Sequence, residues 1–216
     1  MNGFLLSASS LALREVRRFL RQRSRLIGAI GTPIVFWLLL GSGMGRSFQG
    51  STTGMEGEGF LSYFFPGALA LTVLFGSIYS TISIIQDRQQ GFLQGVLVSP
   101  APRWSIVLGK IAGGALLAIF QGAIFLALSP VAGVPTTAIG LALALAWIAL
   151  LSVGLTGLGF YFAWQMDSVQ GYHGVMNLLL MPMWMLSGAV FPASGAHGWL
   201  RPVMLANPLT YGVEGI

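Results

Sequence analysis

The residues of this sequence that are best suited to polar chemistry lie in one stretch, residues 86–110, which interrupts a long apolar chain. The stretch opens with Gln86, Asp87 and Arg88 and closes with Lys110. In so apolar a chain, charged side chains must lie in water, at an interface or in a paired site. We therefore expect the stretch to form a loop on one face of a membrane, where its charges can contact solvent, headgroups or a partner.

This loop should contain a short amphipathic helix. We expect a helical turn to begin at Asp87 and to include Gln90, because an acid near a helix N-terminus is favoured by the helix dipole. The next apolar residues recur at helical spacing and form one face: Phe92, Leu93, Val96 and Leu97. Pro100 and Pro102 should end the helix, since the residue before a proline is disfavoured in the α conformation. Such a helix either docks into a groove on a partner or rests on lipid headgroups, and local physics favours neither.

Other kinds of chemistry lack the residues that they require. The phosphate-binding pattern G-x-x-x-x-G-K-[S/T] is absent, so we do not expect the chain to bind ATP in that way. His173 and His197 have no further histidine or carboxylate at metal-ligand spacing, and the chain has no cysteine. His173 fits an interface histidine better than a proton relay, and Ser187 lacks the flanking pattern of an intramembrane serine protease. The expectation is a chain that is not an enzyme, with no catalytic, metal or cofactor site.

The composition indicates a membrane protein. Hydrophobic residues make up 55% of the chain and charged residues 8%, against roughly 25% charged residues in soluble domains. Six of the eleven basic residues lie between Arg14 and Arg25, beside the first apolar segment. This asymmetry is a signal of membrane topology rather than of nucleic-acid binding.

The hydropathy pattern predicts an all-α, polytopic helical protein formed by a single domain over 1–216. An amphipathic helix over residues 3–24 should lie in the membrane interface, and residues 86–104 form the cytosolic loop. The five predicted spans are 26–45, 60–85, 105–128, 137–164 and 171–191. Nine of the eleven basic residues then fall on the same side of the membrane as the N-terminus, and this bias predicts that the N-terminus is cytosolic. The membrane is expected to be the inner (plasma) membrane.

Two blocks of residues resemble the type-2 ATP-binding-cassette exporter permeases, and most closely the branch of daunorubicin-resistance and nodulation-factor exporters. The first is DRQQGFLQGVLVSPAPRWSIVLGK, over residues 87–110, which resembles the first cytosolic loop of these permeases. The second is SGAVFP at 187–192 followed by NPLTY at 207–211. The family pattern often has an acid where Gln89 and Gln90 stand here, so the contact with a partner is expected to be less ionic.

This resemblance implies an export permease that moves an apolar or amphiphilic substrate, such as a drug, lipid or glycolipid, out of the cytoplasm. ATP would bind to a separate cytosolic ATPase subunit, which would dock on the loop through the polar residues Asp87 and Arg88 and the apolar anchors Phe92 and Leu93. The docking site would comprise Asp87, Arg88, Gln90, Gly91, Phe92, Leu93, Val96 and Leu97. A second copy of the chain, or a homologous permease, would complete a dimer.

A substrate path at the dimer interface would then be lined by the second and fifth spans. Its candidate residues are Thr72, Ser80, Asn177, Met181 and Trp184. Gln121 and Asn177 either touch substrate or form hydrogen bonds between helices. We expect the spans to lack charged residues, and this absence argues against transport that is coupled to an ion gradient.

The family also implies that residues 192–216 form an outer re-entrant pair of helices before a sixth span, so we expect the given chain to lack that span. The alternative function is a non-transport membrane scaffold or assembly protein, in which the helix of the loop is bound only to lipid.

Overall fold

The structure is a computed structural model that describes residues 2–48, 59–134, 137–191 and 197–216. These parts of the chain form helices and turns, with no strand. The N-terminal elements are α1 (Asn2–Arg21), α2 (Arg23–Phe48), α3 (Phe60–Tyr63) and α4 (Phe65–Gln89). The middle elements are α5 (Phe92–Leu97), α6 (Arg103–Leu126) and α7 (Ala138–Gln165). The C-terminal elements are α8 (Val169–Trp184), the π-helical turn η1 (Met185–Ala189), α9 (Leu200–Ala206) and α10 (Pro208–Gly215).

Four helices are long and apolar enough to cross a membrane, judged by length and composition. They contain the segments Leu26–Gly43, Phe60–Gln89, Arg103–Leu126 and Ala138–Gln165. These segments correspond to the first four predicted spans. The all-helical, polytopic fold class predicted from the sequence is therefore confirmed.

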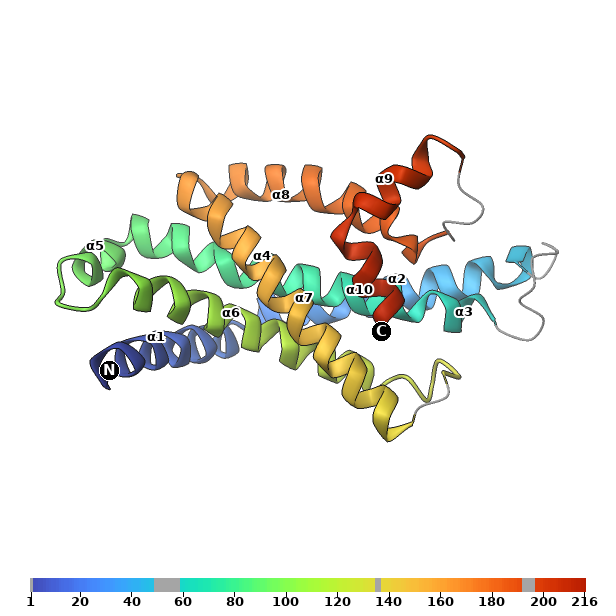
Figure 1. Cartoon of the computed structure of the whole chain (residues 1–216), viewed down its shortest axis with the longest axis horizontal. Helices are drawn as coiled ribbons and strands as arrows, with labels where there is room; N and C mark the ends of the chain where they lie inside the picture. Colours follow the sequence, from blue (N-terminus) through green and yellow to red (C-terminus); the bar gives the residue numbers. More distant parts are fainter. Residues whose placement is uncertain (1, 49–58, 135–136, 192–196) are drawn as a thin grey trace.

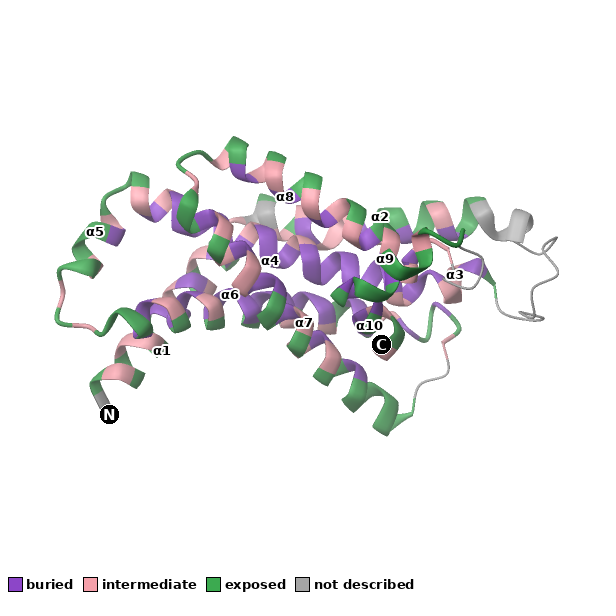
Figure 2. Cartoon of the chain, turned by 45° about the horizontal axis from the view of Figure 1, so that its top comes forward, coloured by how far each residue is buried: buried purple, intermediate pink, exposed green. Residues whose placement is uncertain are grey.

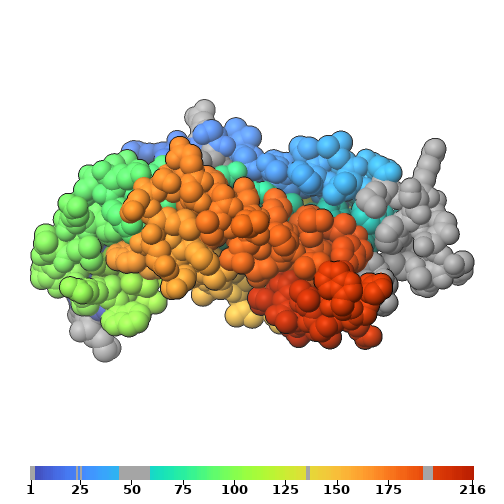
Figure 3. Space-filling model, turned by 90° about the horizontal axis from the view of Figure 1, so that it is seen from above, coloured from blue at the N-terminus to red at the C-terminus, as the bar shows by residue number. Residues whose placement is uncertain are grey.

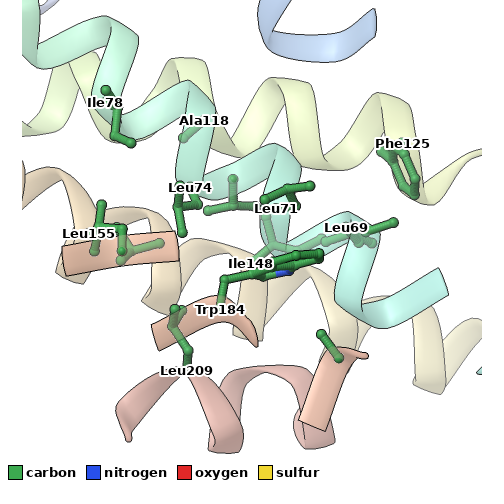
Figure 4. Packing of buried hydrophobic residues seen from close by; sticks show 14 of the residues in the cluster. Leu69, Leu71, Leu74, Ile78, Ala118, Phe125, Ile148, Leu155, Trp184 and Leu209 are labelled. Carbon is green, nitrogen blue, oxygen red and sulfur yellow. The ribbon is translucent and has the colours of Figure 1, made fainter. Parts of the chain in front are cut away.

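Helix α4 is the centre of the molecule. Its candidate span is 89% buried, whereas that of α7 is 28% buried, and the purple of α4 in Figure 2 contrasts with the green of the outer half of α7. A helix that is apolar on all sides is stable only when neighbours surround it, and α4 contacts α2, α6, α7 and α8. In the core, Leu71 and Leu74 of α4 lie among Ala118, Ile148 and Leu155 from α6 and α7 (Figure 4).

The predicted amphipathic N-terminal helix is present as α1, which lies alongside α6 (Figure 1). Its apolar residues Leu11, Ala12 and Phe19 are buried against the protein. Only Gln22 separates α1 from α2. Whether α1 also lies in the membrane interface stays a prediction.

One local prediction was wrong, and one predicted span has more structure than expected. The turn expected to begin at Asp87 is instead the C-terminal end of α4, and the helix of the loop begins at Phe92. Gly91, with φ of 75°, makes the break, because this left-handed conformation is costly for other residues. The predicted span 171–191 comprises α8 and, directly after it, η1, which contains Gly188 at φ of 87°. Whether these two elements together cross a membrane stays a prediction.

The region 192–216 contains the short helices α9 and α10, which resemble the expected helical pair in number. Residues 192–196 lie outside the described residues, as do residues 49–58, which form most of the segment between the first two predicted spans. The segment between the third and fourth predicted spans is described as far as Val134.

Candidate coupling site

The carboxylate of Asp87 is the centre of a buried ionic cluster at one end of the bundle. Asp87 is 0% exposed. Arg14 from α1 binds it in a bidentate manner, with Nη1 3.0 Å from Oδ2 and Nη2 3.1 Å from Oδ1. Arg18, one turn further along α1, donates from Nη1 to Oδ1 at 2.5 Å. Lys110 of α6 donates from Nζ to Oδ2, so one carboxylate joins three helices.

Glu15 is the second acid of this cluster, and it is almost as deeply buried as Asp87. The Nζ of Lys110 lies 2.6 Å from Oε1 of Glu15, and Arg14 Nη1 lies 3.2 Å from the same oxygen. The side chains of Lys110 and Glu15 are 2% and 5% exposed. Three cations and two anions thus meet, and Asp87, Glu15 and Lys110 are buried, while the side chains of Arg14 and Arg18 are 33% and 20% exposed. Buried charges are tolerated when they are paired and hydrogen-bonded, and each charge of the cluster meets this condition.

The mutual contacts also act on the guanidinium of Arg14. Its partial burial alone would lower its pKa, but the hydrogen bond and the charge of Asp87, with the charge of Glu15, raise that pKa above the ordinary value. Arg14 therefore stays charged, and the cluster keeps its bidentate pair.

Small residues allow α1 to approach α6 closely enough to build this cluster. A Cβ atom added to Gly109 would lie 2.7 Å from the carbonyl oxygen of Ala8, and one added to Gly113 would lie 2.8 Å from Cβ of Glu15. Helices meet most closely where glycine and alanine face each other. The spacing Gly109-x-x-x-Gly113 puts both glycines on one face of α6, which brings Glu15 within reach of Lys110.

Helix α5 packs against the same end of α1. The ring of Phe92 lies 3.6 Å below the guanidinium carbon of Arg14, in a cation–π contact. Leu93 is 3% exposed and packs on Leu11 of α1 and Ile106 of α6. The two predicted apolar anchors therefore face inward and hold α5 on the bundle.

The surface that α5 presents outward is formed by other residues of the loop. Among the predicted docking residues, Gln90, Gly91 and Leu97 are exposed and Val96 is half-buried. Val98 and Trp104, which the sequence reasoning did not select, are 86% and 74% exposed. Val98 follows α5, and Trp104 lies in the first turn of α6, so both exposed apolar side chains lie beside the loop.

Arg88 lies next to Asp87 in sequence but forms a different link. Its guanidinium donates to Oδ1 of Asp167 at 3.2 Å and to the carbonyl oxygens of Met166, at 3.3 Å, and Trp164. Gln89 Nε2 adds a hydrogen bond of 2.8 Å to the carbonyl oxygen of Asp167. These contacts fasten the end of α4 to the turn between α7 and α8.

The five residues predicted to line a path do not share one surface. Thr72 and Ser80 are buried in α4 and donate to carbonyl groups of their own helix, those of Ala68 and Ser77. Trp184 is 5% exposed and donates from Nε1 to the carbonyl oxygen of Gly67 at 2.7 Å. The other two lie on α8, where Asn177 is exposed and Met181 is half-buried.

The sequence reasoning missed Arg14, Glu15, Arg18 and Lys110. A usable signal was present, because Glu15 is the sole acid in a strongly basic helix and Lys110 lies within a predicted span, 105–128. The expectation that the spans lack charge is corrected by Lys110, which lies in the candidate span Arg103–Leu126, and by Asp87 in Phe60–Gln89. Among the described residues no group of three acids, histidines or cysteines could hold a metal ion.

Comparison with known proteins identifies the family. The model of the ABC-2 type transporter family matches residues 7–216. The chain belongs to the ABC-2 type transporter family. It is accordingly a membrane transport permease, a non-enzymatic subunit.

Individual relatives agree with this assignment. The chain is 27% identical over 205 residues to a putative transport permease, ycf38, of Cyanophora paradoxa, which covers 93% of this chain and 70% of that protein. It is 30% identical over 147 residues to the probable multidrug ABC transporter permease YbhR of Escherichia coli K12, covering 68% of this chain and 40% of YbhR. Nodulation protein J of Rhizobium meliloti is 25% identical over 193 residues, or 88% and 72% of the two chains. No significant match to a solved structure is found.

Proposed function

We propose that this permease exports an apolar or amphiphilic substrate from the cytoplasm and that a separate ATPase subunit drives it by docking on residues 90–104. The observation that carries the proposal is the connection between this loop and three long helices. Phe92 and Leu93 fix α5 to α1, and Asp87 joins α1 to α4 and α6. A push on α5 therefore reaches the spans through packed contacts and ion pairs.

The roles of the predicted docking residues are redistributed in this proposal. Asp87 and Arg88 transmit force within the permease, since both are engaged with its own helices. The ATPase contacts the outward residues Gln90, Leu97 and Val98, together with Trp104. Movement of the loop then shifts the helices as nearly rigid bodies between inward-open and outward-open states.

A second copy of the chain, or a homologous permease, completes the transporter in this proposal. Figure 3 shows α8, in orange, running across one face of the molecule. Asn177 lies exposed on this helix beside Leu178, which is 78% exposed. An amide exposed to lipid is unfavourable, because hydrocarbon offers it no hydrogen-bond partner. We place α8 against the partner permease, with Asn177 and Met181 toward the substrate path.

The orientation is part of the same proposal. The N-terminus and α5 lie at the same end of the bundle (Figure 1). Most basic residues belong to the segments at this end, and that bias supports a cytosolic position for it. The membrane is then the inner (plasma) membrane.

The docking claim is tested with Val98→Asp. Val98 is 86% exposed and makes no contact within the hydrophobic clusters of the described residues, so the fold should tolerate the change. A charge there should reduce transport-coupled ATP turnover by more than tenfold in membranes that contain both subunits. Val131→Asp is the matched control, since Val131 is also exposed, at 70%, in the turn after α6. Turnover that is unchanged in Val98→Asp would contradict docking at this face.

The alternative function, a scaffold without transport, makes a different prediction for the same assay. No ATPase would copurify, and candidate substrates would not stimulate ATP turnover. The exposure of Val98 and Trp104 favours a protein partner at this end of the bundle.

A further inference from the structure

A long apolar groove lies between α1 and α6. Its volume is about 720 Å³, and every lining residue except Ser9 is apolar. The walls include Leu13, Val16 and Leu20 from α1 and Leu116, Phe120 and Ala123 from α6. Leu116 and Phe120 are 54% and 51% exposed. Because α6 contains a candidate span, the groove continues the surface that this helix offers to lipid.

Two arginines of α1, Arg17 and Arg21, lie next to residues that line this groove, although neither is part of the lining itself. Arg17 follows Leu13 by four residues and precedes Leu20 by three, so these three side chains are neighbours on the helix surface. Arg21 continues the same row one turn later. Both arginines are exposed, and within the described residues neither makes an ion pair or a side-chain hydrogen bond. Arg14 and Arg18 differ in this respect, since Asp87 engages both.

We propose that this groove binds one anionic phospholipid, whose acyl chain lies between α1 and α6 and whose phosphate binds Arg17 and Arg21. The apolar walls match the chain, and the two unpaired cations match the headgroup. Neither feature alone defines the ligand. Their adjacency on one helix favours a molecule with a long apolar tail and an anionic head over an uncharged amphiphile.

The bound lipid would support the position of α1. One side of α1 carries Arg14, Glu15 and Arg18, which form the ionic cluster with α4 and α6. The groove side carries Leu13, Val16 and Leu20. A lipid in the groove would therefore contact the same helix that connects the docking loop to the spans. This inference does not depend on the identity of the exported substrate.

Native mass spectrometry tests the proposal on the natural full-length protein, extracted from membranes with its bound subunits. Phosphatidylglycerol and phosphatidylcholine with identical acyl chains are supplied in equal amounts. We expect retention of phosphatidylglycerol to exceed that of phosphatidylcholine by about tenfold or more, the order of magnitude for two arginines near an anionic headgroup. The double variant Arg17→Gln/Arg21→Gln should bring the ratio to about one. Arg201→Gln, a change at an exposed arginine of α9, should leave the ratio unchanged and serves as the control.

Two further measurements distinguish lipid binding in the groove from non-specific attraction of anionic lipid to basic residues. Ala123→Trp places a large side chain in the groove and should lower retention of both lipids in protein that remains monodisperse. A photo-crosslinking residue at Leu116 should yield a lipid adduct. A preference for phosphatidylglycerol that survives the double arginine variant overturns the proposal. Crosslinking of Leu116 to another polypeptide also overturns it and assigns the groove to a protein partner.

Discussion

Asp87 and Arg88 are neighbours in sequence, yet the links that they form differ in almost every physical respect. Asp87 is fully buried and is bound by three cations from α1 and α6. Arg88 reaches the turn between α7 and α8, where its acidic partner Asp167 has a side chain that is 94% exposed. Removing one partner of a buried ion pair strongly destabilises a protein, whereas an exposed ion pair contributes little to the free energy of unfolding. The comparison teaches that the ion pairs joining α4 to α1 and α6 are buried and strong, whereas the ion pair joining α4 to the α7–α8 turn is exposed and weak, so that link depends mainly on hydrogen bonds to backbone carbonyls.

The substitution Asp87→Ala should have the largest effect. It leaves the side chains of Arg14, Arg18 and Lys110 with Glu15 as their one buried anion, and loss of one partner of a buried pair costs about 3–5 kcal/mol. We expect most of the monodisperse protein to be lost after extraction in detergent, measured by size-exclusion chromatography. Asp167→Ala removes the exposed acid and serves as the matched control. Equal yields of monodisperse protein for the two variants would contradict the proposed difference in strength between the two links.

Lys110→Met should have a smaller effect than Asp87→Ala. Methionine keeps most of the volume of lysine, and Asp87 retains both arginines, so the loss falls mainly on Glu15. Adding Glu15→Gln should recover part of the lost thermal stability, because the carboxylate left without Lys110 is then neutral. A double-mutant cycle of melting temperatures measures this coupling. Strict additivity would show that Glu15 and Lys110 act independently, contrary to the cluster described.

Phe92→Leu tests the attachment of α5. Leucine preserves an apolar contact but removes the ring from Arg14, and a cation–π contact contributes about 0.5–1 kcal/mol. We expect the melting temperature to fall by a few degrees. The same change in an Arg14→Gln background should cause no further loss from this interaction. A full additional loss there would assign the role of Phe92 to packing alone.

Asp167→Asn should have the smallest effect, about 0–1 kcal/mol, since the pair is exposed and Arg88 keeps its contacts with backbone carbonyls. The difference in melting temperature between this variant and the parent should shrink as salt is raised, because salt screens exposed charges. A difference as large as that of Lys110→Met, and independent of salt, would show that the second link is also strong.

The positions of the long helices could be predicted because they depend on local hydropathy. Residues 105–128 and 137–164 were expected as spans, and α6 and α7 begin and end within two residues of these limits. The π-helical turn before Val190 could not be foreseen, because it contains Gly188 in a left-handed conformation and is accompanied by no change in apolar character.

The partners of the charged residues could not be predicted for a different reason. The pair Arg14–Asp87 joins residues 73 positions apart, and a single sequence contains no direct record of such proximity. The amphipathic pattern of the loop indicated an apolar face that includes Phe92 and Leu93. It did not indicate that this face packs against helix α1 of the same chain, whereas the side chains of Val98 and Trp104 are exposed.

The single residue between α1 and α2 has a mechanical consequence. The backbone N–H of Gln22 donates to Phe19 and its carbonyl accepts from Leu26, at 2.9 Å and 3.2 Å, so the hydrogen-bonded chain is nearly continuous across the junction. A joint of this kind has little slack. We therefore expect any rotation of α1 about its ionic cluster to displace the start of α2 as well.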